Sequence, residues 1–303
     1  FFFDRHRGAE IFTRAVQGAY VGFDGDEKNV SLNPFDCRNT PNNRAFLRRW
    51  LKAITMVDDA LSEKEIGRAV TTAFDYLKPE ERILKNLYKS CFSPTGNMRR
   101  ELFRWINPDQ YGNIFNAEND SLDLASKRFM AFDFTHIFED ETLAPAVISY
   151  IMHRIMAETG DTGVPSLIMI DETAPMLKHP MFRDYFIIGL QEGRKKRQAY
   201  LCAFQQPNII DKLGVGEVIR GQCQTVIFFR NPQAMPEDYA NWNLTQREID
   251  FIFGKSYRDF PYAILLSRPA TGESVILDVD LSGLGPYLKL YTSGRKNVLL
   301  LKN

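Results

Sequence analysis

Short apolar runs that alternate with amphipathic segments constrain the fold of this chain more than any other feature. Strands buried on both faces of a sheet are continuously apolar, and the amphipathic helices between them supply the cover. The alternation therefore predicts an α/β fold with a mostly parallel sheet and helices on both of its faces. We expect strands at residues 1–4, 128–134, 166–170, 200–204 and 225–229, and helices at 8–16, 45–54, 142–157, 181–192 and 215–221.

The middle of the sequence contains helical patterns without a convincing strand. From residue 62 to residue 106 one helical segment follows another, and prolines mark the breaks between them. This block predicts an all-helical insertion into the α/β core. We therefore expect the first part of the core at 1–57, the helical insertion at 58–127 and the remainder of the core at 128–303.

The last part of the core is predicted to end in a hairpin and closing segments. Runs at 262–267 and 273–279 flank a turn that contains Pro269 and Gly272, which predicts an antiparallel hairpin on the sheet edge. Segments at 284–291 and 297–301 would close the fold.

Two vicinal acids follow directly on the apolar run at 166–170. Asp171 and Glu172 lie where a buried parallel strand ends, and carboxylates are costly to place there without a use. In a site that hydrolyses ATP, Asp171 would accept a hydrogen bond from a water on magnesium, and Glu172 would orient or deprotonate the attacking water. The alternative is a turn acid followed by a helix cap, which explains one of the two acids.

Other polar residues also fall at predicted strand ends. Ligands of open parallel sheets bind beyond the carboxyl ends of the strands, where Asp4, Asp133 and Gln205 are expected together with the acid pair. Gln205 is a candidate sensor, because its amide can bond a phosphate or the attacking water. It can also be read as a turn residue before Pro207, and Asp133 as a cap.

The densest basic cluster runs from Arg194 to Arg197. Cations are favoured at a helix C-terminus, and a run of charge is usually a solvated face. Arg194 is also a candidate for stabilising transition-state charge at the nucleotide of a neighbouring subunit. We leave Lys195, Lys196 and Arg197 as surface charge, or as the lining of a ring pore or a partner face.

Composition narrows the possible partners and the compartment. Lys plus Arg and Asp plus Glu number 38 each, so no global field attracts nucleic acid or anionic lipid. No apolar run reaches the length of a membrane span and no signal peptide opens the chain, which makes a cytosolic location the default. The cysteines and histidines lack paired spacing, so we expect reduced core thiols and no zinc site.

The start of the sequence reads as the end of a buried strand, so we expect a piece excised from a longer protein. A phosphate-binding loop of the form Gly, four residues, Gly, Lys, Ser or Thr does not occur in the sequence. Gly254, Lys255 and Ser256 imitate its end, but Ile249 stands at the position of the first glycine and residues 245–253 look helical. We expect this segment alone to bind nucleotide poorly.

Motifs spread over nearly the whole chain carry a family resemblance. They are Phe2 to Asp4 with Arg7 and Gly8, Leu32 to Phe35, Tyr111 and Gly112 with Phe115 and Asp120, Asp171 and Glu172, Gly193 to Lys196, Ala203 to Gln205, Asp280 to Leu284, and Ser293 to Arg295. With these motifs the chain resembles the C-terminal motor domain of the large ATPase of type IV secretion and conjugation machines. This is the VirB-four, CagE and TrbE family, within the FtsK and HerA superfamily of P-loop NTPases.

The resemblance implies a RecA-like core with a helical insertion, ATP and magnesium as ligands, and assembly into hexamers or dimers. It also implies docking with other secretion components at the cytoplasmic face of the inner membrane, and a DNA or protein substrate. In this family Asp171 would be the magnesium residue, Glu172 the water residue, Gln205 the sensor and Arg194 a finger acting across subunits. Asp4 and Arg295 are further candidates for contact with the nucleotide.

The chain departs from the family pattern near these residues. In family members an aromatic residue often follows the acid pair shortly after it, whereas this chain has Thr173, Ala174 and Pro175 there. Family members usually have a threonine directly before the sensor glutamine, whereas this chain has Phe204. Three functions stay open: a secretion ATPase that drives assembly or substrate transfer, a DNA-translocating motor like a coupling protein, and a non-hydrolysing scaffold.

Overall fold

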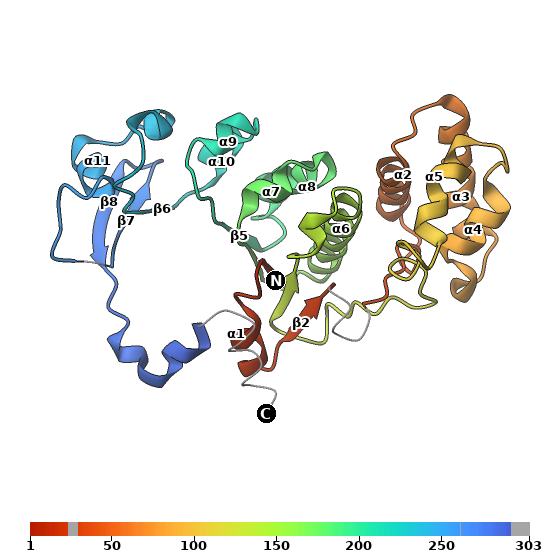
Figure 1. Ribbon diagram of the computed structural model, residues 1–303, viewed down its shortest axis with the longest axis horizontal. Coiled ribbons are helices and arrows are strands. Elements are labelled where there is room, and N and C mark those ends of the chain that lie inside the picture. The colour runs from red at the N-terminus through yellow and green to blue at the C-terminus, as the bar shows by residue number, and fades with distance from the viewer. Residues whose placement is uncertain (24–29, 261, 292–303) are drawn as a thin grey trace.

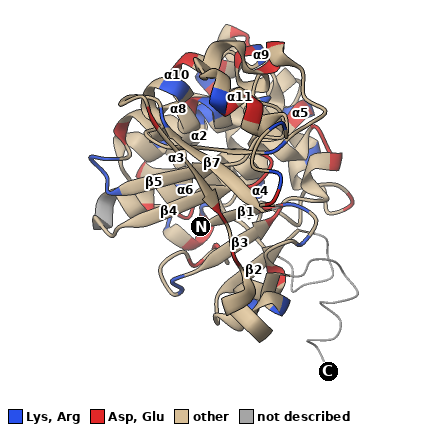
Figure 2. Cartoon of the chain, turned by 90° about the vertical axis from the view of Figure 1, so that its left-hand side faces the viewer, with Lys and Arg blue, Asp and Glu red and all other residues tan. Residues whose placement is uncertain are grey.

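A five-stranded parallel sheet forms the centre of the molecule. The computed structural model describes residues 1–23, 30–260 and 262–291. The strand order is β2-β3-β1-β4-β5, as the labels of Figure 2 show, and all neighbouring pairs are parallel. The strands are β1 (Phe2–Asp4), β2 (Ala19–Gly22), β3 (Met130–Asp133), β4 (Ser166–Ile170) and β5 (Gln198–Cys202). The predicted α/β class with a mostly parallel sheet is confirmed.

Helices pack on both faces of this sheet. On one face the central hydrophobic core joins Ile168 and Ile170 of β4 to the apolar sides of the longer helices. On the other face α1 packs on β2 and β3 through Ala9, Tyr20 and Ala131. The helices of the first face are α6 (Leu143–Thr162), α7 (Thr173–Leu177) and α8 (Pro180–Glu192), and α1 is Glu10–Ala15.

The described residues leave the second face of the sheet partly uncovered over β4 and β5. Leu167 and Leu201 point away from Ile168 and Ile170, and each is 48% exposed. Side chains of successive strand residues alternate between faces, so these leucines belong to the face that α1 covers only over β2 and β3.

The helical block between β2 and β3 shares its core with the sheet. Trp50 donates from Nε1 to the carbonyl oxygen of Ala146 on α6 over 3.1 Å, and Trp105 donates to that of Ile54 over 3.1 Å. Phe115 packs against both tryptophan rings. The block consists of α2 (Pro41–Thr55), α3 (Ala60–Asp75), η1 (Pro79–Glu81), α4 (Leu84–Cys91) and α5 (Asn97–Ile106). Within residues 58–127, the predicted insertion, lie α3, η1, α4 and α5 and no strand, whereas α2 belongs to the stretch that was predicted as core; the boundaries at 58 and 127 stay predictions.

A second, antiparallel sheet lies apart from the first, at the left of Figure 1. It consists of β6 (Val226–Phe229), β7 (Ala263–Arg268) and β8 (Glu273–Asp278) in that order. Its small core gathers Phe228, Tyr239, Phe251 and Leu265. The other elements beside this sheet are η3 (Pro236–Trp242) and α11 (Gln246–Ile252). α9 (Ile209–Lys212) and α10 (Gly216–Gln222) bury Ile210 and Ile219 in the central core, and η4 (Ser282–Tyr291) contacts α1. The short helix η2 (Ile137–Glu139) follows β3.

Two predictions about the antiparallel sheet were wrong. The run at 225–229 is not a strand of the parallel sheet, and the hairpin of β7 and β8 is not on the edge of that sheet. Ile227 is 44% and Phe229 70% exposed, so β6 buries one face only, as antiparallel strands commonly do. The sequence pattern also missed β2 and α7, and it placed β5 two residues too late. The predicted closing segment at 297–301 lies outside the described residues.

Candidate active site

The carboxyl ends of the central strands meet at one edge of the parallel sheet. Asp4 at the end of β1 lies in register with Asp133 at the end of β3, and Phe3 lies in register with Ile170, the last residue of β4. Asp171 donates its backbone N–H to the carbonyl oxygen of Phe3 over 3.0 Å. The acid pair therefore continues the same edge as Asp4 and Asp133.

The turn after β4 directs Glu172 toward the neighbouring strand. Its backbone is left-handed, with φ 50° and ψ 56°, a conformation that a residue with a side chain adopts at a cost of about 1 kcal/mol or more. The N–H of Glu172 donates to Oδ1 of Asp171 over 3.1 Å. The next N–H, of Thr173, donates to the carbonyl oxygen of Ala203 over 3.0 Å, which ties this turn to the chain after β5.

Both carboxylate oxygens of Glu172 have partners from other strand ends. Gln205 donates from Nε2 to Oε1 over 3.0 Å. Arg5, which follows Asp4 at the tip of β1, pairs through its NH1 with Oε2. The structure thus brings together Glu172 and Gln205, which lie 33 positions apart in the sequence.

Asp4 lies at this edge, but its carboxylate accepts hydrogen bonds from other groups of the protein. It is almost fully buried and accepts from the N–H groups of Gly8 and Ala9, over 3.1 and 3.0 Å, and from the hydroxyl of Tyr20, over 2.9 Å. Burial raises the pKa of Asp4 to about 6, although the bonds from Ala9 and Tyr20 act in the opposite direction. Asp4 therefore shapes the loop that follows β1. Its assignment to nucleotide contact stays a prediction.

The carboxylate of Asp171 could serve as an outer ligand of a cation. Its side chain is half-buried, and among the described residues it accepts from the N–H of Glu172 at Oδ1. A carboxylate with an oxygen left to accept suits magnesium, which keeps several of its waters and takes few protein ligands. Across the described residues, no group of three or more His, Cys, Asp or Glu is arranged to hold a metal ion directly. Contact of Asp171 with magnesium through a water stays a prediction.

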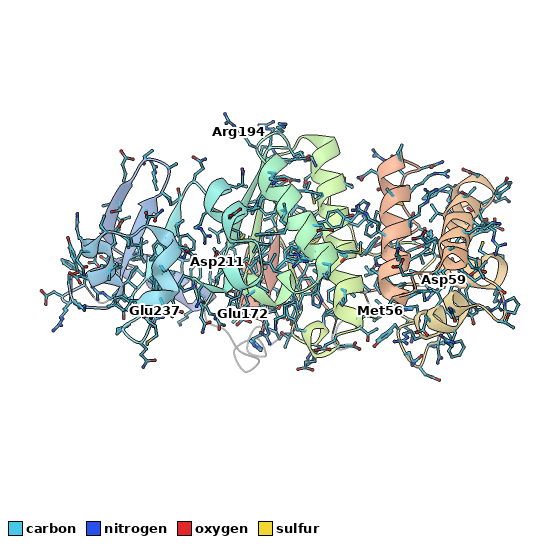
Figure 3. All side chains as sticks on the ribbon, turned by 90° about the horizontal axis from the view of Figure 1, so that it is seen from above. Met56, Asp59, Glu172, Arg194, Asp211 and Glu237 are labelled. Carbon is cyan, nitrogen blue, oxygen red and sulfur yellow. The ribbon has the colours of Figure 1, made fainter. Side chains whose placement is uncertain are left out.

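The structure does not bring Arg194 to the acid pair. Arg194 lies in the turn before β5, and β5 begins in register with the first residue of β4, so this arginine is at the amino ends of the strands. Figure 3 shows Arg194 and Glu172 on opposite sides of the ribbon. Any contact of Arg194 with a nucleotide would have to involve another subunit. Arg295 lies outside the described residues.

The imitation of a phosphate loop has no strand before it. Residues 246–252 form α11, and Gly254 has φ +70° in the turn that ends this helix. A phosphate loop needs a strand before it and a helix after it. The triplet of Gly254, Lys255 and Ser256 is therefore a helix end, as expected.

Comparisons with known proteins identify the relatives of this chain. The type IV secretion system protein VirB4 of Bartonella henselae is 28% identical over 307 residues, which are 99% of this chain and 38% of that protein. The chain is a homologue of VirB4. The conjugal transfer protein TrbE of Rhizobium radiobacter is 26% identical over 82% of this chain and 33% of TrbE. The chain thus spans about two fifths of the length of its VirB4 relative. No profile of a protein family matches it.

Solved structures support the same fold. VirB4 of Thermoanaerobacter pseudethanolicus matches with a TM-score of 0.71 at 12% identity, over 94% of this chain and 82% of that one. The plasmid coupling protein TrwB, in complex with a non-hydrolysable GTP analogue, matches with a TM-score of 0.52 at 10% identity, over 92% and 85%. The predicted RecA-like core of the VirB4 type is confirmed.

One further residue of the candidate site, Arg5, was not predicted from the sequence. Arg5 touches Glu172, but only acids and an amide were sought at the strand ends. The signal was present, because Arg5 is the residue after Asp4, as Glu172 is the residue after Asp171.

The described part of the chain holds no helix long and apolar enough to cross a membrane. The four cysteines carry free thiols, of which Cys91 is buried and the other three are half-buried.

Proposed function

We propose that this chain forms part of an ATPase that powers the assembly of a bacterial type IV secretion or conjugation apparatus, or substrate transfer through it. One observation carries the proposal: Glu172, second of two acids at the end of β4, receives a hydrogen bond from Gln205 beyond the adjacent strand. A carboxylate and a neutral amide that meet at the carboxyl edge of a parallel sheet can orient a water for attack on a phosphate. The kinship with VirB4 and TrbE supports the secretion context.

The residues take separate roles in this proposal. Asp171 would accept from a water bound to magnesium, while Glu172 would orient or deprotonate the attacking water. Gln205 would sense the terminal phosphate, since its Nε2 now points at Glu172 and its position is exposed. Bound magnesium would neutralise phosphate charge. Arg194 would act on the nucleotide of a neighbouring subunit.

The proposal extends to the assembly and the location of the protein. We expect a homo-oligomer, a hexamer or a dimer, attached to the cytoplasmic face of the inner membrane with other secretion components. The relatives are more than twice as long as this chain, whose sequence lacks the phosphate loop. We therefore expect this chain by itself to be inactive, and the full-length protein to hydrolyse ATP.

The test is Glu172→Gln in the full-length protein. The amide keeps the size of the side chain and removes its negative charge, so ATP should still bind while turnover falls on the order of a hundredfold or more. Turnover is measured as phosphate release and binding with a fluorescent ATP analogue. Glu158→Gln, on α6, is a control of the same chemistry. Turnover within about twofold of the parent would remove Glu172 from the reaction.

The same preparation separates the alternatives. A DNA-translocating motor would bind DNA with an affinity that falls steeply as salt rises. Equal numbers of basic and acidic residues do not favour that reading, and Figure 2 shows both signs interspersed over the elements in view. A scaffold would bind its partners unchanged in the Glu172→Gln variant.

A further inference from the structure

Arg5 contacts the central carboxylate of the proposed site. It follows β1, and its NH1 pairs with Oε2 of Glu172, the oxygen that Gln205 does not contact. Both side chains are partly exposed, at 32% for Arg5 and 21% for Glu172. A pair exposed to this extent contributes about 1 kcal/mol or less to stability, so folding alone gives little reason for it.

The guanidinium of Arg5 is held in one place. Its carbon lies 5.5 Å from the ring centre of Phe138, within reach of a cation–π contact. Its Nε–H is buried and has no acceptor among the described residues. A buried donor without an acceptor costs about 1–3 kcal/mol. The side chain accepts this cost in the orientation in which NH1 pairs with Glu172.

The loop that carries Arg5 is fixed by the end of its own strand, β1, and by the end of the neighbouring strand β3. Asp4 accepts from the N–H groups of Gly8 and Ala9, which folds the chain back immediately after Arg5. On the other side, the N–H of His6 donates to Oγ1 of Thr135 over 2.7 Å, and Thr135 in turn donates to Asp133 over 2.5 Å. The buried acids thus hold the backbone on which Arg5 reaches Glu172.

We propose that Arg5 is a positioning residue that fixes the carboxylate of Glu172 for its work on the attacking water. This inference rests on the proposed ATPase function and adds a residue to it. A glutamate side chain has several rotamers, and a left-handed backbone does not by itself select one. Arg5 and Gln205 hold one oxygen each, so the carboxylate stays in a single orientation at the strand ends. Misplacement of a reacting group by about 1 Å can cost a hundredfold in rate.

The experiment compares Arg5→Gln and Arg5→Lys in the full-length protein. We expect kcat for ATP hydrolysis to fall about tenfold to a hundredfold in Arg5→Gln, with KM for ATP changed by less than about threefold. Arg5→Lys keeps the charge but loses the planar fork, so it should recover part of kcat. The melting temperature should stay close to that of the parent, because the pair is partly exposed.

A second background tests whether Arg5 acts through Glu172. If it does, adding Arg5→Gln to Glu172→Gln should change the residual turnover by less than about twofold, because the group it positions is already disabled. The matched control is Arg44→Gln. Arg44 also pairs with a carboxylate, that of Asp75, and lies over the ring of Phe74, but it is in the helical block. This variant should keep the parent kcat.

The outcomes distinguish a failure of the proposed ATPase function from a failure of the role proposed for Arg5. A parent that does not hydrolyse ATP overturns the proposed function and this inference together. An active parent whose Arg5→Gln variant keeps kcat overturns the inference alone. Equal losses from Arg5→Gln in the parent and in the Glu172→Gln background would also overturn it, because they indicate an effect on the fold rather than on Glu172.

Discussion

Asp4 is a buried carboxyl group whose ionisation works against folding. Its pKa is about 6 in the folded chain against an ordinary value of 3.8, chiefly because burial disfavours the charged form. Between these two values the folded state binds more protons than the unfolded state. The contribution of Asp4 to stability is therefore fully present below about pH 4 and is lost as pH rises through about 6.

The prediction at Asp4 is a difference between two stability profiles. At about 1.4 kcal/mol per pKa unit, the unfolding free energy should fall by on the order of 3 kcal/mol from pH 4 to pH 7 because of this group. Asp4→Asn removes the titration, so its profile should lack that fall even if the variant is less stable throughout. Urea unfolding at a series of pH values measures both. Parallel profiles would show that Asp4 does not titrate in this range.

Asp4 also shows what a sequence can and cannot indicate at this scale. Its place at a strand end was predictable from the apolar run before it. The direction of its carboxylate was not, because that depends on Tyr20 and on the N–H groups of Gly8 and Ala9. The contact of Glu172 with Gln205 was inferable from their strand ends, whereas Arg5 needed the fold of its loop.

At the level of elements, His153 joins three helices. It lies on α6, receives the hydroxyl of Tyr185 on α8 at Nδ1 and donates from Nε2 to Oδ1 of Asn43 on α2, over 3.2 and 2.8 Å. Asn43 is the acceptor because its Nδ2 donates to the carbonyl oxygen of Arg38. The imidazole also stacks on Phe46, with ring centres 3.9 Å apart. This arrangement needs the neutral ring.

Acid should therefore loosen this helix junction. Burial lowers the pKa of His153 from 6.5 to about 3, and the nearby charges of Arg49 and Arg154 act in the same direction. Below pH 6.5 His153 is protonated in the unfolded chain but stays neutral in the folded chain. The free energy of unfolding therefore decreases as pH falls, by about 1.4 kcal/mol per pH unit. His153→Gln should remove this part of the slope between pH 6 and pH 4 in urea unfolding. An unchanged slope would contradict the assignment.

The elements were predictable where burial and sequence pattern agree. Ser166–Ile170 was placed to the residue because its apolar run ends at charged residues. β2 is four residues long and two of its residues, Ala19 and Gly22, are small, so its apolar pattern is weak. β6 looked like a central strand because Ile227 and Phe229 are apolar, but both are exposed. Apolar residues on a surface give the same signal as a core.

For the whole molecule, the position of Arg194 decides how the proposed enzyme can work. The acid pair is at the carboxyl ends of the strands, and Arg194 is at the amino ends, on the other side of the ribbon in Figure 3. One subunit therefore cannot supply both to one nucleotide. Head-to-tail rings bring opposite surfaces of neighbouring subunits together, which would allow Arg194 to serve the site of the next subunit.

Mixing two inactive variants tests this arrangement. Arg194→Ala should lose most ATP hydrolysis in the assembled full-length protein, because the transition-state charge is no longer compensated. Mixed with Glu172→Gln, it should regain activity: a site with Glu172 from one variant and Arg194 from the other is complete, which random mixing in equal amounts gives at about a quarter of sites. Phosphate release is measured across mixing ratios after subunit exchange. Lys195→Ala, in the same exposed turn, is the control and should remain active. If no ratio restores activity, Arg194 does not act between subunits.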